Sequence, residues 1–281
     1  MFPLEVRSLS KTYPSFRLKS VSFSLEAGKI TGFIGRNGAG KSTTLKSLFN
    51  LVHPESGTVR FFGENFTEHE ISIKCRVGFV AGGTDYYPRK PLHTITGVTK
   101  LFYHDWDDGD YRKYITQFGL DESKTPSQLS TGMKVKYALA LALSHHAELL
   151  ILDEPTSGLD PVSRDELLDL FMELSRKGTT VLFSTHITSD LDKCADNILY
   201  IKDGAILAES TLPAFSGSYR LTEVAGDTLP PALKKKAAGL RRTKDGYSVL
   251  LQTADTPSLA VETNPASLEE IMIHLERGVN A

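Results

Sequence analysis

The sequence is poor in cysteine and contains no long apolar run. Its 281 residues include two cysteines, Cys75 and Cys194, which stand far apart and share no motif. Such isolated thiols exclude a disulfide framework and are typical of a reducing compartment. No stretch approaches the roughly 18 apolar residues of a membrane span, and the first residues lack the basic segment and apolar core of a signal peptide. We therefore expect a cytoplasmic protein that works at a membrane only through a partner.

A strong excess of charge is also missing. The formal net charge is −2, so the composition gives no sign of a general attraction to nucleic acid or to an anionic membrane. The apolar content of 40% is ordinary for a globular protein. The length suits one large domain, or a main domain followed by a small appendage.

The most informative pattern is a glycine-rich stretch between an expected strand over 29–34 and an expected helix over 41–50. It fits G-x-x-x-x-G-K-[ST], the phosphate-binding loop, and consists of Gly35, Arg36, Asn37, Gly38, Ala39, Gly40, Lys41, Ser42 and Thr43. Glycines let backbone N–H groups approach phosphate oxygens, and the helix start adds its positive dipole end. Lys41 adds a full positive charge, and Ser42 offers a hydroxyl to Mg²⁺. The stretch therefore predicts a nucleotide phosphate site.

Three titratable side chains follow expected strands. Residues 149–152 form an apolar run, typical of a central parallel strand, that leads into Asp153 and Glu154. His186 follows a second such run over 180–184. Because α/β sheets bind ligands at the carboxyl ends of their strands, we expect these side chains at the ligand rim. Asp153 suits direct or indirect ligation of Mg²⁺, and Glu154 suits polarising an attacking water.

A second helix start that can receive an anion lies at Ser130 and Gly132, just before an expected helix over 135–143. A nucleotide bound at the glycine-rich stretch does not need another phosphate site in the same chain. One explanation is that this helix start faces the nucleotide of a second copy. Further along, a tight loop ends at Asp160 before an expected helix over 161–177.

Two other features have competing explanations. Tyr13 lies in an expected loop between strands over 4–9 and 21–25, where it could stack on a nucleotide base or pack at a strand end. A group of four acids does not match the ligand order of a calcium loop, and we interpret it as a solvated turn at a helix start. The four are Asp105, Asp107, Asp108 and Asp110.

The pattern weakens over 210–218, where we place a boundary. Beyond it we expect strands over 219–224 and 247–253, a short helix over 233–240, and a last helix opened by a capping box that starts at Ser267. These elements suit a small α+β appendage. A basic cluster in the appendage is interpreted as a solvated helix face, and it comprises Lys234, Lys235, Lys236, Arg241, Arg242 and Lys244.

With these motifs in this order, residues 1 to about 210 resemble the nucleotide-binding subunit of an ABC transporter. The resemblance rests on the glycine-rich stretch, the signature-like segment 129–133, the acid strand 149–154, the loop 157–160 and the histidine at position 186. It implies an α/β fold of the P-loop ATPase class with a mixed sheet core, a helical subdomain and an antiparallel β part at the N-terminus.

The same resemblance implies a division of the chain. Residues 1–210 are expected to form the ATP-binding domain, with the helical subdomain at about 84–145. Residues 219–281 are expected to form a small accessory domain, similar to those on bacterial subunits that pair with separate membrane proteins, often exporters.

The resemblance further implies a head-to-tail pair of subunits that encloses two ATP molecules and moves an integral membrane permease by hydrolysing them. The second subunit is another copy or a homologue, the chain lies at the inner face of the membrane through the permease, and no nucleic acid partner is expected. Glu154 would orient the water, and His186 would contact the γ-phosphate. Ser42 and Asp153 would hold Mg²⁺. The implied nucleotide contacts are Tyr13 on the adenine, residues 35–43 on the phosphates, Asp160, and the other subunit's Ser130 and Gly132.

The chain departs from the family pattern at three positions. Thr131 stands where the family usually has glycine, and Met133 where it usually has glutamine. Gly82 stands where a glutamine is expected to touch Mg²⁺ and signal to the permease. Since glycine has no side chain, we hypothesise that water, Thr84 or Asp85 replaces that glutamine.

Other functions for these motifs are less well matched. A non-transport ABC ATPase acting on DNA or ribosomes usually carries long coiled coils or two cassettes, and the chain has one cassette without sustained heptads. A P-loop kinase does not need a signature-like helix start. A regulatory module with little turnover could omit the carboxylate of Glu154.

Overall fold

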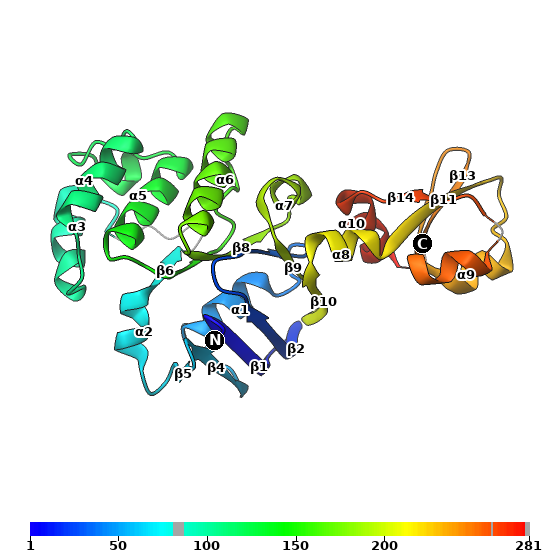
Figure 1. Cartoon of the computed structure of the whole chain (residues 1–281), viewed down its shortest axis with the longest axis horizontal. Helices are drawn as coiled ribbons and strands as arrows, with labels where there is room; N and C mark the ends of the chain where they lie inside the picture. The colour runs from blue at the N-terminus through cyan, green and yellow to red at the C-terminus, as the bar shows by residue number, and fades with distance from the viewer. Residues whose placement is uncertain (81–86, 260, 279–281) are drawn as a thin grey trace.

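The structure is a computed structural model, and it describes residues 1–80, 87–259 and 261–278. Three sheets follow one another across the molecule, with helices packed around them (Figure 1). In the part of the chain that the structure describes, no helix has the length and apolar character needed to cross a bilayer.

The first sheet is antiparallel and contains the N-terminus. Its strand order is β2-β1-β4-β5, formed by β1 (Leu4–Tyr13), β2 (Phe16–Leu25), β4 (Ser56–Phe61) and β5 (Glu64–Asn65). The strands predicted over 4–9 and 21–25 are therefore too short, and the loop predicted around Tyr13 is wrong. Residues 11–13 continue β1 because β1 and β2 form a tight hairpin in which Tyr13 pairs with Phe16.

The central sheet is mixed and has the strand order β10-β9-β3-β8-β7-β6. Its strands are β3 (Ile30–Ile34), β6 (Val77–Val80), β7 (Leu149–Leu152), β8 (Thr180–Thr185), β9 (Asn197–Lys202) and β10 (Ala205–Thr211). β10 is antiparallel to β9, and the other neighbours are parallel. Every residue of β3, β7 and β8 is buried, as expected for strands covered on both faces. Their carboxyl ends therefore meet at one rim of the sheet.

Helices cover this sheet and form a separate group at one end of the molecule (Figure 1). α1 (Lys41–Leu48), α2 (Glu70–Arg76), α6 (Pro161–Arg176) and α7 (Thr188–Cys194) connect the strands. The separate group contains α3 (Leu92–Thr99), η1 (Lys100–Phe102), α4 (Asp108–Gln117), η2 (Pro126–Gln128) and α5 (Thr131–Ser144), and it has a small apolar core of its own. These elements confirm the predicted fold class.

Two helix starts in this group follow from local capping. α5 begins at Thr131 rather than at residue 135, because the Ser130 hydroxyl accepts the Met133 N–H at 3.2 Å and so allows an earlier start. Asp107 caps α4 by accepting the N–H groups of Gly109 and Asp110. The group of acids near Asp107 is thus a helix start, as the sequence indicates.

The third sheet contains the C-terminal strands in the order β12-β13-β11-β14. Its elements are β11 (Tyr219–Ala225), β12 (Ala237–Arg242), β13 (Gly246–Gln252) and β14 (Asn264–Pro265), with α8 (Leu212–Gly217), α9 (Pro231–Lys236), η3 (Thr253–Ser258) and α10 (Leu268–Arg277). The capping box predicted at Ser267 is confirmed, since its hydroxyl and the Glu270 carboxylate cap each other's backbone.

The helix predicted over 233–240 is wrong in its second half, because the chain leaves α9 after Lys236 and enters β12. Leu240 is buried beside Val249 and Leu251 of β13, which an extension of α9 would not allow. Gly239 also lies so close to α10 that an added Cβ would be 2.3 Å from a backbone oxygen. The basic cluster is consequently divided among α9, β12 and the bend at Lys244, and it does not form one helix face.

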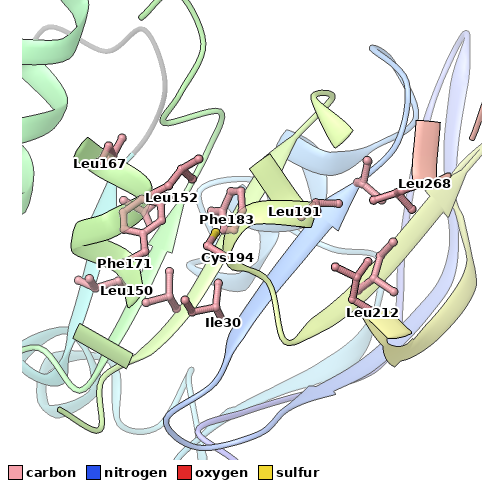
Figure 2. Packing of buried hydrophobic residues seen from close by; sticks show 14 of the residues in the cluster. Ile30, Leu150, Leu152, Leu167, Phe171, Phe183, Leu191, Cys194, Leu212 and Leu268 are labelled. Carbon is pink, nitrogen blue, oxygen red and sulfur yellow. The ribbon is translucent and has the colours of Figure 1, made fainter. Parts of the chain in front are cut away.

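The apolar core runs without a break from the central sheet into the C-terminal sheet (Figure 2). Phe171 of α6, Phe183 of β8 and Leu191 of α7 belong to the same buried cluster as Leu212 of α8 and Leu268 of α10. Polar contacts add to this packing at the end of α10. The Tyr200 hydroxyl donates to Glu276 at 2.8 Å, and the Lys202 ammonium donates to the Leu275 carbonyl at 2.6 Å.

This shared core predicts that a cavity in α10 weakens the whole chain. Ile271 is fully buried in the shared cluster, so Ile271→Ala is expected to lower the free energy of unfolding by about 3 kcal/mol. In a urea titration we expect one transition, moved to lower urea. The exposed Ile71→Ala makes the same chemical change and is expected to shift stability by about 0.5 kcal/mol or less. If a separate, smaller transition accounted for the entire decrease in the free energy of unfolding, the C-terminal sheet would unfold independently.

Candidate functional site

The glycine-rich stretch connects β3 to α1, and two of its glycines have a left-handed backbone. Gly38 has φ 84° and Gly40 has φ 113°, which side chains with a Cβ rarely adopt. A Cβ on Gly40 would also lie 2.8 Å from the Phe16 ring. The loop therefore turns into the N-terminus of α1, where unpaired N–H groups favour an anion.

Lys41 is the first residue of α1, and its side chain is held beneath this loop. Its side chain is 5% exposed, and the ammonium donates to the carbonyl oxygens of Gly35 at 2.6 Å and Arg36 at 3.4 Å. The same ammonium is 3.2 Å from Oε1 of Glu154. A buried cation at the mouth of an N–H-rich loop is suited to the charge of a polyphosphate.

Asp153, directly after β7, meets the first turn of α1. Ser42 Oγ donates to Asp153 Oδ1 at 3.1 Å, and Ser184 Oγ at the end of β8 donates to the same oxygen at 2.7 Å. Ser184 Oγ also accepts the N–H of Glu154 at 2.9 Å. A hydroxyl and a carboxylate side by side are the hard oxygen donors that Mg²⁺ prefers, so the pair of Ser42 and Asp153 fits this ion.

Glu154 bridges the cation of α1 and the histidine that follows β8. His186 Nδ1 donates to Glu154 Oε2 at 2.7 Å, while Oε1 faces Lys41. Glu154 has φ 51°, a left-handed conformation that costs free energy for a residue other than glycine. Such strained backbone occurs preferentially at functional sites, where the surrounding structure maintains it.

These side chains surround one cleft of about 430 Å³, lined by Phe16, Arg36, Asn37, Gly38, Gly40, Lys41, Ser42, Thr43, Glu154, Ser157 and His186. Phe16 is a lining residue that no sequence motif indicated. Tyr13, the predicted aromatic contact, is not among the described residues that line the cleft. Its ring centroid lies 6.5 Å from that of Phe16, and it is 38% exposed. No short sequence pattern marks this second ring, since its place depends on the hairpin register that pairs Tyr13 with Phe16.

The structure does not bring the signature-like residues into this cleft. Of the residues that the structure describes, those lining the cleft include neither Ser130 nor Gly132. Gly132 instead packs against the loop after Glu154, since a Cβ there would lie 2.9 Å from the Leu159 side chain. α5 belongs to the helical group, away from α1 (Figure 1).

The Asp160 carboxylate has a structural role within its own chain, as the N-cap of α6. Its carboxylate caps α6 by accepting the N–H groups of Val162 and Ser163, each at 3.0 Å. The hydrogen bonds from Ser163, followed by the one from Val162, hold the pKa of the Asp160 carboxyl below its ordinary value. Asp160 thus stays ionised, and it stands outside the cleft of its own chain.

Gly82, Thr84 and Asp85, the predicted departure and its suggested substitutes, lie outside the described residues. Of the other histidines in the described residues, His145 has a packing role. His145 is buried, stacks on Tyr103 with ring centroids 3.9 Å apart, and donates from Nδ1 to the Cys75 carbonyl. Burial lowers the pKa of His145 and keeps its ring neutral.

Comparison with known proteins gives matches over the whole chain. Residues 18–157 match the family model described as ABC transporter. The chain is 33% identical over 210 residues to the bacitracin transport ATP-binding protein BcrA of Bacillus licheniformis, covering 73% of this chain and 69% of that protein. It is 29% identical over 300 aligned positions to the Nod factor export ATP-binding protein I of Burkholderia orbicola (strain AU 1054), covering 97% and 96%.

A solved structure titled as an ATP-binding subunit of an ABC transporter is similar in fold. The TM-score is 0.68 at 28% sequence identity, covering 76% of this chain and 91% of that chain.

Proposed function

Because the chain belongs to the ATP-binding proteins of ABC transporters, which are ATP hydrolases, we propose that it pairs around two ATP molecules and powers a separate membrane permease. The partner in the pair is a second copy or a homologous subunit. The observation that carries this proposal is the convergence of three separate segments on one cleft. Lys41, Ser42, Glu154 and His186 line the cleft, and Asp153 is hydrogen-bonded to Ser42 beside it.

Each of these residues has a distinct part in hydrolysis. Lys41 and the loop amides would hold the β- and γ-phosphates, while Ser42 and Asp153 would hold Mg²⁺. When bound, Mg²⁺ neutralises part of the charge on the phosphate oxygens. Glu154 would orient the attacking water and accept its proton. His186 would contact the γ-phosphate, and its hydrogen bond to Glu154 would help to hold that carboxylate toward the water.

Pairing completes the site. The cleft around Lys41 is open, and the anion-receptive start of α5 lies elsewhere on the same chain. In a head-to-tail pair, Ser130 and Gly132 of one subunit would face the γ-phosphate held by the other, and Asp160 would lie at the same boundary. Phe16 lines the cleft and has Tyr13 beside it, so the adenine would stack on this aromatic pair.

A groove between α2 and the helical group is suited to the permease. It has a volume of about 600 Å³ and is lined by Ile71, Lys74, Cys75, Tyr87, Lys90, Thr94, Ile95, Val98, Thr99, Phe102 and Tyr103. Ile71, Tyr87, Val98 and Phe102 expose at least half of their area, which is unusual for apolar side chains gathered in one place and typical of an interaction surface.

We further propose a division of the chain, a cellular location and a direction of transport. Residues 1–210 form the ATP-binding domain, with a helical subdomain over about 84–145, and residues 219–281 form an accessory domain. A chain held by a permease and supplied with ATP lies at the cytoplasmic face of the membrane. The relative named for Nod factor export is aligned over 97% of this chain, including the C-terminal sheet, which favours export as the direction of transport.

Coupling to the permease can be tested at the groove. The chain is reconstituted in liposomes with a candidate polytopic permease, and ATP hydrolysis is compared with that of the chain alone. Phe102→Glu places a charge in the groove and is expected to remove the stimulation. Leu207 is exposed on β10, so Leu207→Glu is the matched control and is expected to keep the stimulation of ATP hydrolysis. Stimulation that survives Phe102→Glu would contradict the assigned docking surface.

A further inference from the structure

We propose that Asp190 is a positioning residue that ties together the three segments carrying Glu154, His186 and Asp160. It lies on α7, 1% exposed, and its carboxylate touches a residue of each segment. This inference rests on the proposed ATPase function and adds a determinant of turnover to it.

Both carboxylate oxygens of Asp190 are engaged. Oδ2 accepts the Thr156 hydroxyl at 2.7 Å and the Thr185 hydroxyl at 3.3 Å, and Oδ1 accepts the Arg164 guanidinium. Thr156 and Thr185 are themselves buried. A buried carboxylate is maintained only when a charge and hydrogen bonds compensate its lost hydration, and the Arg164 cation together with the two hydroxyls meets that requirement.

Each partner is directly connected to a residue of the proposed site. Thr156 lies in the turn that begins at Glu154, whose carbonyl accepts the N–H of Ser157 at 3.1 Å. Thr185 precedes His186, and its hydroxyl also accepts the N–H of Ile187 at 3.0 Å, which fixes the backbone on the far side of the histidine.

The third connection reaches the loop that faces the other subunit. The backbone N–H of Arg164 donates to the Asp160 carbonyl at 3.0 Å in the first turn of α6. The Arg164 guanidinium also donates to the Ser189 hydroxyl at 3.1 Å. Arg164 of α6 therefore contacts both Asp190 and the residue before it on α7. A shift of any one segment therefore strains the same buried carboxylate.

The position of Asp190 predicts which kinetic constant it controls. Within the ranges that the structure describes, the residues lining the cleft include neither Asp190 nor its three partners. The network thus contributes to how Glu154 and His186 are aligned, and not to contacts with bound ATP. Since small errors in alignment slow chemistry strongly, loss of the carboxylate is expected to lower kcat and leave the KM for ATP nearly unchanged.

The test is ATP hydrolysis by the full chain with Mg²⁺. Asp190→Asn keeps the shape of the side chain but removes the charge opposite Arg164, and we expect kcat to fall about tenfold with KM within about twofold. The control is Asp165→Asn, which breaks an exposed ion pair with Lys193 between the same two helices and is expected to keep the wild-type kcat. A folded Asp190→Asn chain with wild-type kcat would overturn the proposal.

A second pair of variants decides the matter if Asp190→Asn does not fold. Thr156→Val removes one hydroxyl with little change of shape and is expected to lower kcat, while Thr156→Ser restores the hydroxyl and is expected to restore kcat. Equal rates for the valine and serine variants would also overturn the proposal. An inactive wild-type chain, or one whose hydrolysis is indifferent to Glu154, would instead count against the proposed function itself.

Discussion

Replacing Glu154 with glutamine is expected to reduce ATP turnover by about a hundredfold or more while ATP still binds. The amide keeps the size of the side chain and can still accept the hydrogen bond from His186, which is 2.7 Å away in the wild-type chain. It cannot take a proton from the attacking water. It also removes a negative charge 3.2 Å from the Lys41 ammonium, which leaves that cation free to hold the phosphates more firmly.

The expected product is therefore a stable pair of chains with ATP enclosed. Phosphate release measures the turnover, and size-exclusion chromatography with Mg²⁺ and ATP measures the pairing. Glu148→Gln, an exposed residue that pairs with Arg76, makes the same chemical change away from the cleft and should behave as the wild type. Unchanged hydrolysis by Glu154→Gln would refute the role assigned to this carboxylate.

The second large effect is expected at Ser130. Aspartate is as good a helix N-cap as serine, so Ser130→Asp keeps the start of α5, where the hydroxyl now accepts the Met133 N–H. In a pair of chains the new carboxylate would face the γ-phosphate of the other subunit. Two like charges a few ångströms apart repel by about 3 kcal/mol near a protein surface, which corresponds to roughly a hundredfold loss of turnover.

A single Ser130→Asp chain is expected to bind ATP with the wild-type affinity, although turnover by the pair is lost. Binding is measured with a fluorescent ATP analogue at low protein concentration, and turnover is measured over a dilution series. Ser127→Asp adds the same charge to η2 in the same helical group and is the matched control. Wild-type turnover by Ser130→Asp, independent of dilution, would show that one chain hydrolyses ATP without a second.

Much of the site could be predicted because its residues are fixed by short, local patterns. The loop from Gly35 to Thr43 and the acids after β7 follow apolar strands directly, and a parallel sheet brings such strand ends together. Phe16 was not predicted because its place at the cleft depends on a hairpin register. Asp190 was not predicted either, since its partners come from three segments that only the folded sheet assembles.

The error in the C-terminal region has a similar cause. Residues 233–240 lack strong signals against a helix apart from Gly239, and local preference alone favours continuing α9. The burial of Leu240 against β13 outweighs that preference. Tertiary packing therefore decides the structure where the local pattern is weak.

Because α10 packs against the central core, part of that core is covered only late in the synthesis and folding of the nascent chain. Synthesis proceeds from the N-terminus, so Leu191, Cys194 and Tyr200 emerge well before the segment that covers them. Until residue 277 has been added, that side of the molecule presents uncovered apolar surface. The nascent chain therefore keeps this apolar surface exposed, and prone to aggregation, until α10 has been synthesised and has packed.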